Sequence, residues 1–378
     1  MFTPETSAHF QLWEDPVTGV KNYILKTRVA AQQMGFYFVN SATDDACRFL
    51  WFYCSFPPAM YMTLGVVDFE TDEVRHFPHA AWLSQPVVDP DTGDCIFGNE
   101  KGFYLLSPKP EKPIRKICPL PPELTRFGPL VDLGSHLTFT PDRKEIFVDA
   151  RSGDKWVHGT LELETGIFRV WNVFSYCKTH GQVNPVNGDL ALCAEDHWIG
   201  MRGGWHDMRT NSRGEFERLW LETRNGRKRM IPPLDRLMAT HEWWNADGTK
   251  VYYCRYGGEE DDIVSYDLKT GKQQVVAPWP AWHAYTSLDS RYLCFDEKDV
   301  FFRGTASRVC FGDTVTQKRV YIVSANPAMA TKASPSPYEL DPHPRFVAKD
   351  RYICHTIAVN GYTEVAMCPV APLIDMTR

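Results

Sequence analysis

The sequence lacks any continuous run of eighteen apolar residues, which is close to the length that a helix needs to cross a bilayer. Its opening residues, Met1-Phe2-Thr3-Pro4-Glu5-Thr6, contain neither the basic nor the apolar region of a secretory signal. We therefore expect a cytoplasmic protein with no membrane partner.

Long basic runs and closely spaced cysteine pairs are also missing. The formal net charge is -6 and no long basic run occurs, which argues against a nucleic-acid partner. The 11 cysteines include no CxxC pair, and most lie in apolar runs, such as those that contain Cys254 and Cys294. A free thiol in such a run behaves as a small hydrophobic side chain. We expect reduced cysteines and no zinc site built from thiolates.

Long amphipathic helical patterns are missing too. The 378 residues instead contain short apolar or alternating runs that are separated by turn signals, which is typical of all-β sandwiches, barrels and propellers. Similar turns recur at intervals of about 42 to 61 residues, which is the length of a four-stranded propeller blade. This repeat favours a propeller over a sandwich or a barrel. The turns begin near residues 41, 88, 140, 184, 245, 287 and 347. The sequence thus predicts one all-β domain over residues 1–378, a seven-bladed β-propeller.

Each repeat continues with a second strand and then a second turn. The apolar run Lys250–Cys254 and the turn Asp267-Leu268-Lys269-Thr270-Gly271 illustrate this, since glycine readily adopts the positive φ that such a hairpin needs. The last repeat is short of a strand, and the extended N-terminal run Lys21–Lys26 could supply it. We expect the ring to close in this way, which removes open sheet edges.

Histidines recur at one position of the repeat. Six or seven residues before the aspartate or asparagine of each turn, on the strand that lines the channel of a propeller, stand Phe38, Gln85, His136, His180, His241, His283 and His343. Five of these seven positions are histidine, although the chain has only 12. One such histidine is ordinarily a packed core residue, but a shared register indicates a ring of imidazoles for metal binding or acid–base chemistry.

The residues near the last of these histidines narrow the choice of metal. Asp341 lies two residues before His343 and therefore on the same strand face. Mixed histidine and carboxylate ligands suit Mn²⁺, Zn²⁺ or Fe²⁺ better than Ca²⁺ or Mg²⁺, which prefer oxygen ligands.

Several motifs resemble those of the oligogalacturonate lyases. They are Trp13-Glu14-Asp15-Pro16-Val17-Thr18-Gly19, Arg218-Leu219-Trp220, Thr240-His241-Glu242-Trp243-Trp244 and Asp341-Pro342-His343-Pro344-Arg345-Phe346, so the resemblance runs from about residue 10 to the C-terminus. It implies a seven-bladed propeller that cleaves acidic oligosaccharides by β-elimination with a divalent metal ion. The implied ion is Mn²⁺, with Zn²⁺ or Ca²⁺ as alternatives.

The resemblance also implies roles for individual residues. The metal ligands fall on His283 and His343, with Asp341 in place of a further histidine. The family's catalytic histidine falls on His241, the leading candidate for the base, and its arginine, a proposed base or partner of the substrate carboxylate, falls on Arg218. The remaining channel histidines His180 and His136 are candidate substrate-binding residues that could orient the sugar, donate a proton to O4 or add a metal ligand. Arg202 and His206, in an insertion at 198–215, are further candidate substrate-binding residues.

This chain departs from the family's pattern at several positions. The family's glutamine ligand is Tyr338 here, and a histidine of its Cys-His-Glu-Gly run is Ala194. These changes point to a divergent member that acts either on oligogalacturonate or on a related uronide, for example a rhamnose–glucuronate type.

Two other functions remain open at this level. A propeller glycosidase would need a carboxylate pair, and the inner strands offer few acids besides Asp341. A non-catalytic propeller would bind a sugar or a protein through one face. Strand alternation further predicts that Glu242 points away from the channel. Trp243 and Trp244 could stack on sugar rings, but aromatic residues of propellers more often fill the space between blades, and we expect this placement. The sequence leaves the oligomeric state undetermined.

Overall fold

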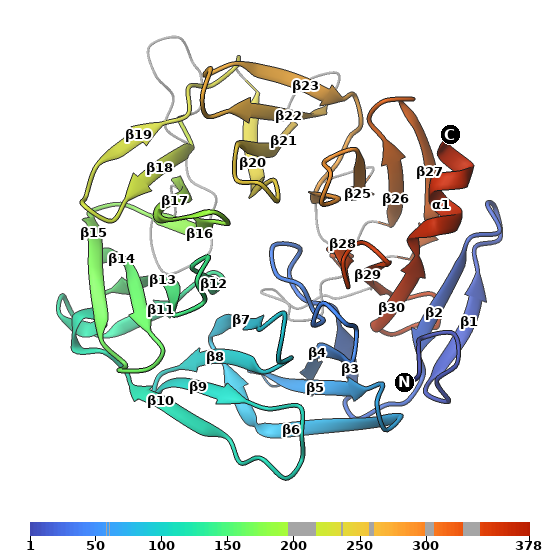
Figure 1. The fold of residues 1–378 in the computed structure, drawn as a ribbon, viewed down its shortest axis with the longest axis horizontal. Helices are drawn as coiled ribbons and strands as arrows, with labels where there is room; N and C mark the ends of the chain where they lie inside the picture. Colours follow the sequence, from blue (N-terminus) through green and yellow to red (C-terminus); the bar gives the residue numbers. More distant parts are fainter. Residues whose placement is uncertain are drawn as a thin grey trace.

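The computed structural model describes residues 1–57, 59, 61–195, 217–235, 237–256, 261–298, 306–327 and 341–378. These residues form seven antiparallel sheets around a central axis (Figure 1). The predicted all-β, seven-bladed propeller is therefore confirmed.

Blades 1 to 6 are each built from consecutive strands, with the first strand at the channel and the last at the rim (Figure 1). Blade 1 contains β3 (Gln32–Met34), β4 (Phe49–Ser55), β5 (Met62–Asp68) and β6 (Glu73–Trp82). Blade 2 contains β7 (Ser84–Val88), β8 (Cys95–Asn99), β9 (Gly102–Leu106) and β10 (Arg115–Pro119). Blade 3 follows the 3₁₀ turn η1 (Pro122–Thr125) and contains β11 (Leu130–Leu133), β12 (Thr138–Phe139), β13 (Glu145–Ser152), β14 (Lys155–Glu162) and β15 (Phe168–Phe174).

The next three blades repeat the same order. Blade 4 contains β16 (Lys178–Asn184), β17 (Asn187–Glu195), β18 (Leu219–Thr223) and β19 (Lys228–Met230). Blade 5 contains β20 (Met238–Trp244), β21 (Lys250–Tyr256), β22 (Asp262–Asp267) and β23 (Gln273–Ala277). Blade 6 contains β24 (Ala284–Thr286), β25 (Tyr292–Lys298), β26 (Ser307–Asp313) and β27 (Lys318–Asn326).

Blade 7 joins the two ends of the chain. It combines β28 (Arg345–Val347), β29 (Tyr352–Ile357) and β30 (Glu364–Pro369) with β2 (Lys21–Leu25) and β1 (Phe10–Glu14) from the N-terminus. Tyr23 pairs with Met367 and Ile24 with Ala366, so the predicted closing strand is confirmed. β1 adds a fifth strand outside it. The C-terminal helix α1 (Val370–Thr377) packs on β26 and β27 of blade 6 (Figure 1).

The second strand of each blade is apolar because neighbouring blades cover both of its faces. All seven residues of β4 are buried, for example. Trp243 and Trp244 lie between blades, as predicted: the indole of Trp243 donates to Thr286 of blade 6 (3.1 Å), and that of Trp244 donates to the carbonyl of Gln182 in blade 4 (3.0 Å). All 11 cysteines are buried free thiols. Within the described ranges, no helix is both long and apolar enough to cross a bilayer.

Candidate active site

The five register histidines lie at the channel end of blades 3 to 7. His180 and His241 belong to the inner strands β16 and β20, and the other three come directly before β12, β24 and β28. Their rings form neighbouring pairs. Ring centroids are 6.1 Å apart for His136 and His180, 4.1 Å for His241 and His283, and 4.2 Å for His283 and His343. Residues more than 200 positions apart in the chain thus share one site.

Three of these histidines have an unusual backbone conformation. His180, His241 and His343 have φ values of 57°, 49° and 46°, in the left-handed region that residues other than glycine rarely adopt. β16 has a bulge between Thr179 and Gln182, and β20 has one between Thr240 and Trp243. A bulge redirects a side chain, and backbone strain of about 1–3 kcal/mol per residue is typical of functional sites.

His283, Asp341 and His343 form a set that can hold a metal ion. One ligand atom from each residue lies within 4.8 Å of the others. The carboxylate of Asp296 accepts the backbone N–H of His283 (2.7 Å) and lies 3.0 Å from its Nδ1. This contact leaves Nε2 of His283 for a ligand. Asp296 also accepts the backbone N–H of His343 (3.3 Å), so one fully buried carboxylate orients two of the three side chains.

His241 stands beside this set in an aromatic cage. Its Nδ1 lies 2.9 Å from the hydroxyl of Tyr256, and the ring of Trp282 contacts it edge-on with centroids 4.9 Å apart. Burial lowers the pKa of His241 well below its ordinary value, and the neighbouring His283 and Arg218 lower it further. His241 is therefore an uncharged imidazole at neutral pH, which is the form that can accept a proton.

Glu242 lies at the channel, so the prediction that it points away is wrong. The left-handed φ of His241 and the bulge in β20 interrupt the alternation on which that prediction relied. The carboxylate of Glu242 accepts a hydrogen bond from Arg218 (2.8 Å) and lies 3.2 Å from Nδ1 of His180. Burial would raise the pKa of Glu242, but the charge of Arg218 and the contact with His180 lower it to about 2. Arg218 itself is only 5% exposed.

His136 completes the ring on the side of blade 3. The side chain is 1% exposed, and among the described residues neither ring nitrogen has a hydrogen-bond partner. Burial, helped by His180, lowers its pKa to about 3. A buried, uncharged imidazole with two unused polar atoms can bind a hydroxyl group, because an unsatisfied buried group costs about 1–3 kcal/mol.

Sequence reasoning did not find two residues of this site, Asp296 and Tyr37. Asp296 is an acid within the apolar run of β25, and a charged residue in a buried strand is the signal that could have identified it. Tyr37 directly precedes the register residue Phe38 of blade 1, and its ring contacts four of the histidines. The predicted substrate-binding residues Arg202 and His206, together with Tyr338, lie outside the described residues.

A second group of potential ligands lies between blades 3 and 4. His158, Cys193 and Glu222 are buried, with one ligand atom of each within 4.8 Å of the others. Nδ1 of His158 is 2.5 Å from Glu222, and its Nε2 is 3.0 Å from the carbonyl oxygen of Lys178. Both ring nitrogens are thus engaged with protein groups. Burial lowers the pKa of His158, but the Glu222 carboxylate outweighs this effect and raises it overall. We interpret the group as an internal ion pair.

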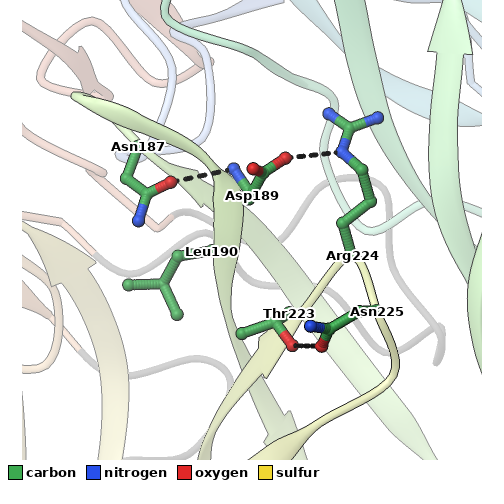
Figure 2. Close-up of a pocket in the computed structure, with 6 residues that line it drawn as sticks. All are labelled: Asn187, Asp189, Leu190, Thr223, Arg224 and Asn225. Atoms are coloured by element: carbon green, nitrogen blue, oxygen red, sulfur yellow. Dashed lines mark hydrogen bonds and ion pairs between the residues drawn. The ribbon is translucent and has the colours of Figure 1, made fainter.

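A surface pocket in blade 4 shares no residue with the histidine site. Figure 2 shows that its charged side chains face one another: Arg224 donates to Asp189 (2.8 Å). Arg224 also donates to Glu145 (2.6 Å), so its charge is compensated. The pocket of about 360 Å³ is lined by Asn187, Asp189, Leu190, Thr223, Arg224 and Asn225.

Comparison with known proteins bears on the fold. No protein-family model and no curated protein matches the sequence. Among solved structures, an oligogalacturonate lyase in complex with manganese superposes with a TM-score of 0.75 at 15% identity, covering 95% of this chain and 96% of that one. The chain has the oligogalacturonate lyase fold. A second such lyase, from Vibrio parahaemolyticus, gives a TM-score of 0.72 at 15% identity, covering 96% of each chain. The predicted resemblance is therefore confirmed at the level of the fold.

Other enzymes share the propeller more distantly. A puromycin hydrolase matches 97% of this chain with a TM-score of 0.60 at 12% identity, and the match spans 55% of that protein. Because such different proteins contain the same architecture, the fold alone does not determine the reaction, which depends on the residues of the active site.

Proposed function

We propose that this protein is a lyase that cleaves acidic oligosaccharides by β-elimination at a uronic acid and leaves a 4,5-unsaturated sugar. The observation that carries the proposal is the group of three potential metal ligands, His283, Asp341 and His343, next to the uncharged His241. The likeness in fold to two oligogalacturonate lyases supports it.

The donor set fits a divalent metal ion. Two imidazoles and one carboxylate suit Mn²⁺, Zn²⁺ or Fe²⁺, and the contact between Asp296 and His283 is the outer hydrogen bond that metal-binding histidines usually have. We propose Mn²⁺, because one oligogalacturonate lyase of this fold is a manganese complex. A divalent ion at these residues would supply positive charge that stabilises the carbanion at C5 through the C6 carboxylate.

The protein's own residues carry the remaining chemistry. His241 accepts the C5 proton on Nε2, since Tyr256 occupies Nδ1. Arg218 keeps positive charge next to His241 and so keeps this base uncharged. Removing one group that stabilises developing charge typically lowers kcat about 10²–10³-fold, or about 3–4 kcal/mol.

His136 and His180 bind the hydroxyl groups of the sugar in this proposal. The two unused nitrogens of His136 suit an uncharged group, whereas the carboxylate of the substrate belongs on the side of the metal ligands. Arg202 and His206 remain candidates for further contacts with the substrate. We propose a uronide related to oligogalacturonate, such as a rhamnose–glucuronate oligosaccharide, as the substrate.

A screen of uronide oligosaccharides tests the proposal. Purified protein is supplied with Mn²⁺ and incubated with pectic, rhamnogalacturonan, glucuronan and gum-type oligosaccharides, while the ultraviolet absorbance of the unsaturated product is followed. We expect one class to give this signal and a chelator to abolish it. His79→Ala serves as a control for variants of the channel histidines, because His79 is an exposed histidine of blade 1.

Two results would contradict the proposal. New reducing ends without the ultraviolet signal would indicate hydrolysis. A protein that binds no divalent metal and cleaves none of these sugars would be a binding propeller.

A further inference from the structure

Tyr37 lies at the centre of the histidine ring. Its ring stacks on that of His136, with centroids 5.7 Å apart and planes inclined by 23°. It meets three other imidazoles edge-on, at 6.4 Å for His180, 6.0 Å for His283 and 4.9 Å for His343. Tyr37 therefore contacts the two histidines among the candidate metal ligands, on blades 6 and 7, and both histidines that are candidate sugar-binding residues, on blades 3 and 4. A substrate that reached these four histidines would touch Tyr37 as well.

Hydrogen bonds from other blades hold the segment that carries Tyr37. Arg345 of blade 7 donates to the carbonyl oxygens of the two residues after Tyr37 (3.0 and 2.7 Å). Asn40 donates to carbonyl oxygens in blades 2 and 3 (2.8 and 3.0 Å). On the other side, the backbone N–H of Gly35 donates to the hydroxyl of Thr356 in blade 7 (3.0 Å). Tyr37 is thus fixed by the ring itself, and catalysis requires this kind of preorganised position.

Elimination at a sugar needs a proton donor as well as a base. The departing O4 leaves as an alkoxide, which is a poor leaving group unless it is protonated. His241 is the base, and His136, with its pKa lowered to about 3, carries no extra proton at neutral pH. A phenol keeps its proton at neutral pH. Tyr37 and the base both contact the ring of His283: ring centroids are 6.0 Å apart for Tyr37 and His283 and 4.1 Å apart for His241 and His283, so the phenol and the base border the same site.

We propose that Tyr37 is the proton donor to O4, a role that rests on the proposed lyase function. His241 removes the proton from C5, and the electrons of that C–H bond form the C4–C5 double bond. The C4–O4 bond breaks, its electron pair stays on O4, and the hydroxyl of Tyr37 transfers its proton to this oxygen. The tyrosinate then regains a proton from the imidazolium of His241 through solvent. The products are the unsaturated uronide and a free alcohol.

The acidity of the leaving group tests this role. Tyr37→Phe keeps the ring and its contacts but removes the proton. One substrate carries a sugar at O4 of the uronide, and the other carries a nitrophenyl ether there, which departs as a stable anion without protonation. We expect Tyr37→Phe to lower kcat about 10²–10⁴-fold on the sugar substrate, and to leave the rate on the nitrophenyl ether close to that of the wild type. Tyr61→Phe is the matched control, since Tyr61 is 60% exposed.

Three outcomes would overturn the inference. Equal losses on both substrates would show that Tyr37 only positions other groups. An unchanged rate on the sugar substrate would show that another group supplies the proton, while the lyase function would stand. If the wild type forms no unsaturated product from either substrate, the proposed function fails and the role of Tyr37 fails with it.

Discussion

Replacing Glu242 by glutamine should strongly destabilise the fold. The carboxylate is fully buried, pairs with Arg218 at 2.8 Å and contacts His180 at 3.2 Å. Glutamine keeps the size of the side chain but leaves the guanidinium of Arg218, only 5% exposed, without its counter-charge. Removing one partner of a buried ion pair typically costs about 3–5 kcal/mol.

The pKa of Glu242 leads to a similar magnitude. It falls from an ordinary 4.5 to about 2 in the folded protein. Each pKa unit between these values corresponds to about 1.4 kcal/mol, so the lowered pKa contributes about 3 kcal/mol to the free energy of unfolding. A carboxyl group with a lowered pKa stabilises the protein fully above its unfolded pKa. This contribution is therefore present above pH 4.5 and is lost as the pH falls towards about 2.

Urea unfolding followed by tryptophan fluorescence measures the effect. We expect Glu242→Gln to lose about 3 kcal/mol near pH 7, and the difference from the wild type to shrink near pH 3. Glu14→Gln is the control, because Glu14 is 53% exposed and pairs with Lys21 at 3.8 Å, an arrangement worth about 0–1 kcal/mol. A loss below about 1 kcal/mol for Glu242→Gln, or a difference that stays constant with pH, would refute the reasoning.

Three further variants test other parts of the site. His241→Ala should lower lyase activity at least about 10²-fold with little change in the urea midpoint. The control His79→Ala should change neither the activity nor the midpoint. Near-normal turnover of His241→Ala would remove His241 from the mechanism. Asp296→Asn should weaken Mn²⁺ binding about 10–100-fold, because the amide orients His283 less well. Titration calorimetry measures this affinity. The control Asp154→Asn, at a side chain that is 79% exposed, should bind Mn²⁺ normally. His158 has a raised pKa, so its ion pair stabilises the fold below pH 6.5 and this stability is lost as the pH rises through the folded value. His158→Gln should abolish that part of the pH dependence in urea unfolding, and an unchanged slope would show that His158 is not charged in the folded protein.

The blades and the register of histidines could be predicted from the sequence because both depend on local rules. A turn such as Asp267–Gly271 encodes a hairpin within five residues, and strand alternation has a period of two. The repeat of these signals predicted seven blades, and the incomplete last repeat predicted that residues 21–26 would close the ring.

The partners across the site could not be predicted in the same way. The error for Glu242 arose because alternation fails at the bulge where His241 adopts a positive φ. Asp296 holds His283 of its own blade and His343 of the next, a contact that exists only after the blades pack together. The contacts of Tyr37 join blade 1 to four other blades and have no counterpart in any local pattern.

The sequence by itself determined that the chain forms a seven-bladed propeller and that five histidines occupy equivalent positions, because turns and strand periodicity act over a few residues. Only the tertiary structure decided which of these side chains touch, which of them are charged, and that Tyr37 lies among them. The physical reason is that contacts, burial and local charge depend on ring closure, which brings Tyr37, His136 and His343 within reach of one another.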